Sequence, residues 1–137
     1  MRVRRKFVES RGFTTDRRRL ERARELVHED IVALEQDILA DPEVGDLIPG
    51  TGGLRKARVG QRSVGRGKRG GARVYYLDLP GRGVTHLIAL FGKREKADLS
   101  NIKEAVELLL EAYRDNAQKD APGNAIWETL SVEVPAA

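Results

Sequence analysis

Four basic side chains near the predicted strands are the residues of this sequence best suited to chemistry. The segment 54–60 reads as a strand, and alternation along a strand places Lys56 and Arg58 on the same face. Arg73 begins the next predicted strand, and Arg94 follows the end of the strand after it. If the three strands are neighbours, these cations could converge on one concave face. Such a cluster can bind a phosphodiester and stabilise the added negative charge of a pentacoordinate phosphorane.

RNA is the phosphodiester that such a site could cleave with the least help. RNA carries its own nucleophile, the 2′-hydroxyl, so a cleaving site needs mainly correct geometry and charge stabilisation. Arginine keeps its proton near neutral pH, whereas a lysine whose pKa is lowered by neighbouring cations could serve as the base. Because DNA has no internal nucleophile, this set of residues favours RNA.

Positive charge is concentrated in one quarter of the chain. The 137 residues carry a formal net charge of +4, yet the segment 47–77 has eight basic residues and no acidic one. The rest of the chain has 17 basic and 21 acidic residues and is therefore acidic. Glycines recur through the basic segment and let the backbone approach a ligand closely. The segment predicts binding of a polyanion, with a solvated surface loop as the alternative.

Several other kinds of site are excluded by what the sequence lacks. There is no cysteine, which excludes disulfides, thiol catalysis and cysteine-ligated metals. The two histidines, His28 and His86, are too far apart for a zinc motif, so we expect no metal and no other cofactor. The glycines at 65, 67 and 70 match a dinucleotide-binding pattern by letter, but a strand rather than a helix follows them.

The sequence contains no candidate membrane segment. No apolar run approaches the roughly 18 residues that a membrane helix needs. The basic start MRVRRKF is not followed by the apolar segment of a signal peptide. We therefore expect a cytoplasmic protein without a membrane partner.

The predicted elements give the order β-α-(α)-β-β-β-α, which is typical of a small α+β domain. A helix capped by Thr14 or Thr15 runs to Ala40, either unbroken or divided near His28. A hairpin turn at 80–83 joins two strands, and a last helix begins at a Ser100 cap. We expect one domain over 1–120 and a tail over 121–137 in which no element is predicted. The predicted strands cover 5–10, 54–60, 72–79 and 84–91.

Three motifs in this order resemble the RelE superfamily of bacterial type II toxins, and within it the HigB-type branch. The motifs are GDLIPGTGGLRKARV, GRGKRGGARVYY and FGKREKADLS, and the resemblance runs from about Phe7 to Arg114. It implies a microbial-ribonuclease-like fold: a small twisted sheet of antiparallel type in the order β-α-α-β-β-β-α, with an N-terminal helical hairpin and a C-terminal helix. It also implies metal-independent, ribosome-dependent cleavage of mRNA, which inhibits translation.

The resemblance implies roles for individual residues. Lys56 and Arg58 match the basic pair of the family's second strand, Arg73 the arginine that opens the third, and Arg94 the arginine after the fourth. These four are the implied catalytic residues. The implied RNA- or ribosome-binding residues are Arg55, Arg66, Lys68, Arg69, Lys93 and Lys96.

Two departures from the family pattern concern the general base. RelE toxins place a catalytic tyrosine shortly after the GKRE motif, where this chain has Ser100, and HigB-type relatives often have tyrosine in place of Phe91. Tyr76, on a neighbouring strand, is a candidate substitute.

Two alternatives to a nuclease stay open: a ParE-like toxin that binds DNA gyrase, and a non-catalytic RNA- or ribosome-binding domain. The expected partners are the ribosome with its mRNA and a cognate antitoxin, itself a DNA-binding protein in this interpretation. An acidic helix or tail would complement the basic segment.

Overall fold

The computed structural model describes residues 2–61, 65, 71–115 and 127–135. The elements follow one another as β1 (Arg2–Ser10), α1 (Arg11–Arg22), α2 (His28–Ala40), β2 (Asp46–Leu47), β3 (Leu54–Val59), β4 (Ala72–Leu79), a single 3₁₀ turn (Pro80–Arg82), β5 (Val84–Phe91), α3 (Leu99–Asp115) and β6 (Trp127–Pro135). The chain therefore has the α+β composition predicted from its sequence.

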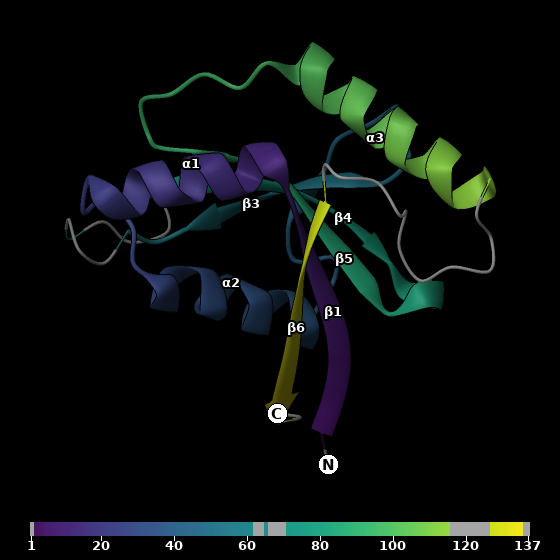
Figure 1. Ribbon diagram of the computed structural model, residues 1–137, viewed down its shortest axis with the longest axis horizontal. Coiled ribbons are helices and arrows are strands. Elements are labelled where there is room, and N and C mark those ends of the chain that lie inside the picture. The colour runs from purple at the N-terminus through teal and green to yellow at the C-terminus, as the bar shows by residue number, and fades with distance from the viewer. Residues whose placement is uncertain (1, 62–64, 66–70, 116–126, 136–137) are drawn as a thin grey trace.

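One six-stranded sheet, in the order β2-β3-β4-β5-β1-β6, organises the molecule (Figure 1). The β2-β3, β3-β4, β4-β5 and β1-β6 pairs are antiparallel, but β1 and β5 are parallel. The sheet expected to be of antiparallel type is thus mixed, with four antiparallel pairs and one parallel pair among the described residues. The strands β3, β4 and β5 are consecutive antiparallel neighbours. The last of them, β5, runs in the same direction as β1, so the pair that these two strands form is parallel.

Two apolar cores lie on the two faces of the sheet. On one face α1 and α2 pack through side chains that include Phe13, Leu20, Ile31, Leu34 and Ile38. On the other face, α3 packs through Ile102, Val106, Leu109 and Tyr113. The apolar stripes at spacings of three and four residues supply both helix faces. The parts of the sheet that these three helices do not contact remain uncovered.

The N-terminal helical segment is divided in two, and its cap differs from the prediction. Ser10, not Thr14 or Thr15, is the N-cap of α1, because its Oγ accepts a hydrogen bond from the Phe13 N–H at 3.0 Å. Thr14 is buried instead and donates to Glu9 Oε1 at 2.6 Å. After α1 the chain turns at Arg24, which has a φ of 60°. Periodicity alone did not indicate which hydroxyl faces the helix end.

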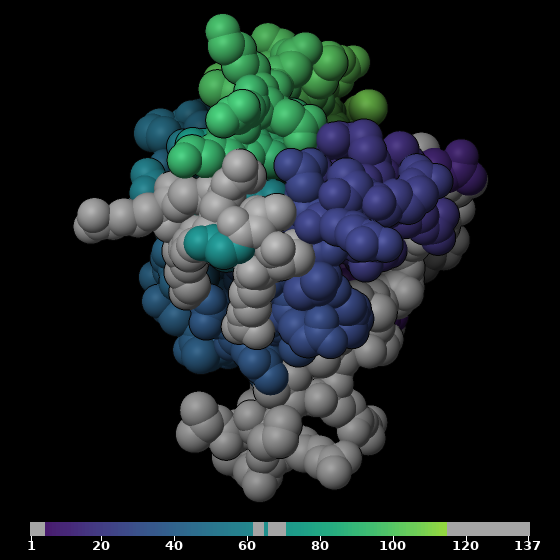
Figure 2. Space-filling view, turned by 90° about the vertical axis from the view of Figure 1, so that its left-hand side faces the viewer, coloured from purple at the N-terminus to yellow at the C-terminus, as the bar shows by residue number. Residues whose placement is uncertain are grey.

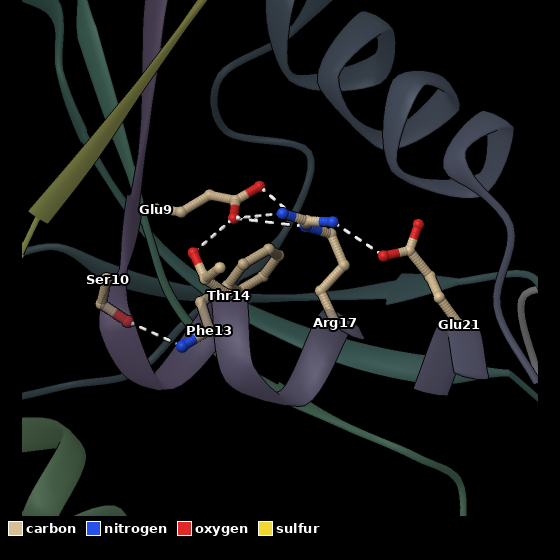
Figure 3. A network of polar contacts seen from close by, with 6 residues as sticks. All are labelled: Glu9, Ser10, Phe13, Thr14, Arg17 and Glu21. Carbon is tan, nitrogen blue, oxygen red and sulfur yellow. Dashed lines mark hydrogen bonds and ion pairs between the residues drawn. The ribbon is translucent and has the colours of Figure 1, made fainter. Parts of the chain in front are cut away.

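A polar network fixes α1 to β1 (Figure 3). The guanidinium of Arg17 donates to Glu9 Oε2 on β1 at 3.1 Å and to Glu21 Oε1 on its own helix at 2.7 Å. Glu35 on α2 is buried nearby, and this burial is the main reason that its pKa rises from 4.5 to about 7; the charge of Glu9 raises it further, while that of Arg17 lowers it. The first core thus contains two buried carboxyl groups whose charges interact.

The connections around the strands also refine the predictions. The tight turn expected at 80–83 is a 3₁₀ turn that ends at Gly83, whose φ of 64° favours glycine. No strand was predicted between α2 and β3, but this connection contains the two-residue strand β2. The last helix begins one residue before the predicted cap, since Asp98 Oδ1 accepts from the Asn101 N–H at 3.2 Å and Ser100 lies in the first turn.

The strand β6 lies within the segment 121–137, where the sequence predicted no element. It pairs with β1 over its whole length, from Arg2 opposite Pro135 to Ser10 opposite Trp127. It therefore forms one edge of the sheet, and β2 forms the other. Within the described residues, none of the helices combines the length and apolar character needed to cross a membrane.

Candidate functional site

The strand register brings three of the four predicted cations onto one face of the sheet. Lys56 on β3 lies opposite Tyr75 on β4, and Arg58 lies opposite Arg73. Residues opposite one another on neighbouring strands share a face, so the alternation predicted for Lys56 and Arg58 is confirmed. On the far side of β4, Arg73 lies opposite Phe91 at the end of β5.

Helix α3 covers only part of this face. Leu54, Leu77 and Ile88 pack under it, and Tyr75 belongs to the same apolar cluster. Lys56, Arg58 and Arg73 lie at the other end of the strands and are not part of that cluster. At this end of the sheet Arg58 is exposed and Lys56 and Arg73 are half-buried, and the aromatic rings of Tyr75 and Phe91 lie beside Lys56 and Arg73.

The segment after β5 forms the wall of a hollow of about 410 Å³ above this part of the sheet. Glu95 holds the segment in place, because its Oε1 accepts from the Gly92 N–H at 2.8 Å and its Oε2 from Arg19 Nη2 of α1 at 2.8 Å. In Figure 2 the chain after β5, in green, lies against the purple surface of α1. The hollow is lined by Lys56, Arg73, Tyr75, Phe91, Lys93, Arg94, Glu95, Lys96 and Ala97.

The charge in the hollow is strongly positive. Five of the nine lining residues are Lys or Arg, and Glu95 is the one carboxylate among them. That carboxylate is neutralised by Arg19: although burial alone would raise its pKa, the hydrogen bonds from Arg19 and from the Gly92 N–H hold the pKa of Glu95 below its usual value. The hollow therefore suits an anion and carries four more positive than negative charges.

Arg58 is near this hollow but lines a smaller one. Together with Lys56 it borders a space of about 220 Å³ whose other lining residues are Leu34, Asp37, Val44, Asp46 and Ala57. Lys56 is common to the two hollows. Of the four cations predicted to converge, Lys56, Arg73 and Arg94 therefore meet in the larger hollow, whereas Arg58 lines the smaller one with Asp37 and Asp46.

The remaining predicted contact residues have different positions. Lys93 and Lys96 line the larger hollow and are exposed. Arg55 points away from it and donates to the Gly45 carbonyl oxygen at 2.8 Å, so it fastens the loop between α2 and β2. The predicted basic loop, with Arg66, Lys68 and Arg69, lies outside the described residues.

The candidate base Tyr76 is committed to the structure. It is fully buried on the opposite face of β4, where its hydroxyl donates to the Pro42 carbonyl oxygen at 2.8 Å and accepts from the Gly45 N–H at 2.9 Å. Ser100 is exposed at the start of α3 and is not one of the lining residues of the hollow. Neither residue is placed to move a proton there.

Tyr75 is a member of the site that the sequence interpretation missed. It lies opposite Lys56 in the strand register, and its ring meets that of Phe91 edge to face at 5.9 Å between centroids. Burial raises the pKa of the Tyr75 hydroxyl, and the positive charge of Arg73 opposes that rise. The signal was present: in a strand that begins at Ala72, residues 73 and 75 share a face.

The histidines take no part in this hollow. His86 is buried on β5, with its Nε2 2.8 Å from the Tyr113 hydroxyl oxygen, and burial lowers its pKa to about 4. His28 is exposed at the start of α2. Within the described part of the chain no three histidine or acidic side chains are grouped so that they could hold a metal ion.

Comparison with protein families adds no assignment, since no family model matches the chain. The function of the chain is therefore inferred from the geometry of the hollow.

Proposed function

We propose that this protein is a type II toxin of the RelE superfamily, of the HigB type, which cleaves mRNA on the translating ribosome. The observation that carries the proposal is the meeting of Lys56, Arg73 and Arg94 in one hollow, although they come from three separate segments of the chain. These are the positions at which the motifs of the sequence resemble the toxin family. The order of the two N-terminal helices, the strands β3, β4 and β5, and α3 also supports it.

The cleavage proceeds by attack of the 2′-hydroxyl oxygen on the adjacent phosphorus. Charge builds up on the non-bridging phosphate oxygens as the pentacoordinate state forms, and fixed cations lower the energy of that state most when water is largely displaced. Arg73 offers a planar fork of N–H donors and Lys56 a compact charge, so the two can contact different oxygens. The products are a 2′,3′-cyclic phosphate and a free 5′-hydroxyl, and no metal takes part.

The exposed basic wall supports a role for a large polyanionic partner. Lys93, Arg94 and Lys96 lie on the outer segment, where ribosomal RNA or mRNA can reach them. The same surface, together with Arg58, would attract the acidic helix or tail of an antitoxin. A cytoplasmic location follows from the proposed partners.

The proposal is tested by expressing the chain from a tightly controlled promoter and mapping mRNA 5′ ends across the transcriptome. We expect new ends inside translated frames, and none in cells that express Arg73→Ala. Lys103→Ala, which removes an exposed charge from α3 away from the hollow, is the matched control and should cleave like the wild type. Arrested growth with unchanged mRNA would contradict the proposal.

One alternative is favoured by a specific observation. Phe91 and Ser100 carry no tyrosine hydroxyl where the toxin family uses one, which would suit a ribosome-binding domain without nuclease activity. Salt-sensitive ribosome binding with intact mRNA is the result that would select it. DNA damage without arrest of translation would instead select the gyrase-binding alternative.

A further inference from the structure

The hydroxyl of Tyr75 differs in its hydrogen bonding from the hydroxyls of the other two tyrosines. Tyr76 uses its hydroxyl to hold the loop between α2 and β2, and that of Tyr113 is 2.8 Å from His86 Nε2. The Tyr75 side chain is only 5% exposed, yet it lines the hollow, and no hydrogen bond to its hydroxyl is found within the described residues. A polar group in this position on an apolar floor is available to a ligand.

The environment keeps this hydroxyl protonated at neutral pH. Burial against Phe91 and the apolar cluster under α3 raises its pKa, and the nearby charge of Arg73 offsets only part of that rise. A group in this state is a proton donor rather than a base. Tyr75 therefore cannot take the place of a tyrosine that removes a proton, but it can supply one.

The reaction needs a proton at the leaving oxygen. When the P–O5′ bond breaks, the electron pair goes to the 5′-oxygen, and an alkoxide is a far stronger base than a phenolate. The arginines of the hollow stabilise charge without giving up a proton. The ammonium groups of Lys56, Lys93 and Lys96 can also donate a proton, but a bound phosphate favours their charged form. Tyr75, opposite Lys56 in the strand register and in ring contact with Phe91, is the neutral donor that the described residues of the hollow provide.

We propose that Tyr75 is the general acid of the cleavage reaction, donating its hydroxyl proton to the departing 5′-oxygen. The inference rests on the nuclease function proposed above. In this step the 2′-oxygen forms its bond to phosphorus and its proton passes to solvent water, while the P–O5′ bond breaks and the 5′-oxygen takes the proton of Tyr75. The phenolate then recovers a proton from solvent, so the protein ends unchanged.

The test compares two leaving groups on ribosome-bound mRNA. One mRNA has the ordinary 5′-oxygen at the scissile bond, and the other has sulfur in its place; a thiolate leaves readily without a proton. Tyr75→Phe retains the ring and its contact with Phe91 and removes only the hydroxyl. We expect this variant to cleave the ordinary mRNA about 10²-fold more slowly at saturation, with unchanged affinity, and to cleave the sulfur-containing mRNA within a few-fold of the wild-type rate.

Three other outcomes are possible, and each leads to one conclusion. A Tyr75→Phe variant as fast as the wild type on the ordinary mRNA overturns the inference and leaves the nuclease function intact. A defect that persists with sulfur shows a structural role and also overturns it. If the wild type cleaves neither mRNA, the proposed function fails and the inference fails with it. Tyr76→Phe is the matched control: it should lower the melting temperature, and sulfur should rescue no part of any loss of rate.

Discussion

Arg73 on β4 is hydrogen-bonded to the main chain of Lys93, with its Nη1 3.2 Å from the carbonyl oxygen. This contact joins the sheet floor of the hollow to its outer wall. The guanidinium has further N–H donors, which stay available for a phosphate. Arg94 follows Lys93 directly in the chain, so the contact also limits the distance between Arg73 on the floor and Arg94 in the wall.

The first prediction concerns Arg73 itself. In the proposed mechanism Arg73 contacts the phosphate, so we expect replacement by alanine to lower kcat for mRNA cleavage by about 10²–10³-fold. Arg73→Lys keeps the charge but not the fork of donors, so it should recover only part of the loss. Single-turnover cleavage on programmed ribosomes measures both variants. Equal activity of the alanine variant and the wild type, with both folded by circular dichroism, would rule out the assigned role.

The second prediction concerns the salt dependence of RNA binding. Lys56 lies on the floor of both hollows, so Lys56→Ala should remove one phosphate contact and reduce the steepness of log Kd against log salt by about 0.7 for single-stranded RNA. Lys103→Ala removes the same charge from an exposed turn of α3 and should leave the slope unchanged. Fluorescence anisotropy across a range of KCl concentrations gives both slopes. Identical slopes for the two variants would show that Lys56 does not contact phosphate.

The third prediction concerns Glu35 and pH. Burial raises its folded-state pKa from 4.5 to about 7, so the folded protein binds more protons than the unfolded chain between these values. Its contribution to the free energy of unfolding is therefore greatest below pH 4.5 and falls as the pH rises to 7, by about 3 kcal/mol. Glu35→Gln does not titrate, and its stability relative to the wild type should increase by about that amount over this range.

Chemical denaturation at several pH values measures this difference, with exposed Glu107→Gln as the control. The variant must be compared with the wild type at each pH because the contribution of His86 to the free energy of unfolding changes with pH in the opposite direction. Burial lowers the pKa of His86 from 6.5 to about 4, so its contribution is complete above pH 6.5 and is lost as the pH falls toward 4. A Glu35→Gln difference that does not change with pH would contradict the burial of an ionisable Glu35.

The fourth prediction concerns the start of β4. A Cβ atom on Gly71 would lie 1.8 Å from the carbonyl oxygen of Val59, so Gly71→Ala forces the backbones of β3 and β4 apart. We expect it to lower the free energy of unfolding by about 1–3 kcal/mol. Gly81→Ala, in the turn before β5, meets nothing within 4 Å and should change stability by less than about 0.5 kcal/mol. Urea denaturation of the two variants decides, and equal midpoints would contradict the close approach.

The sequence predicted the central strands well and the contacts between distant residues poorly. The bounds of β4 and β5 agree with the prediction because β-branched and aromatic residues fill them and Pro80 and Gly83 delimit them. The cap of α1 was misassigned because Ser10, Thr14 and Thr15 all have the chemistry of a cap, and only packing against Glu9 decides among them. Strand β6 was missed because its partner is β1, at the other end of the chain.

The same limit applies to the site. Alternation along β3 correctly placed Lys56 apart from Arg55, since that property is local. The choice between Tyr75 and Tyr76 needed the position of α3 and of the loop between α2 and β2, and neither follows from periodicity. Adjacent residues on a regular strand face opposite sides, so one of the two tyrosines shares the face of Arg73, and counting from Arg73 identifies it as Tyr75.

Cleavage of a single defined mRNA on purified ribosomes tests the central claim most directly. The message is prepared in two forms that differ only by a 2′-hydroxyl or a 2′-hydrogen on the nucleotide before the scissile bond. We predict that the wild-type protein cuts the first form to a 2′,3′-cyclic phosphate, leaves the second intact, and cuts neither when Arg73 is alanine. Cleavage of the 2′-deoxy form, or no cleavage of either form by the folded wild-type protein, would contradict a nuclease that acts through the RNA's own hydroxyl.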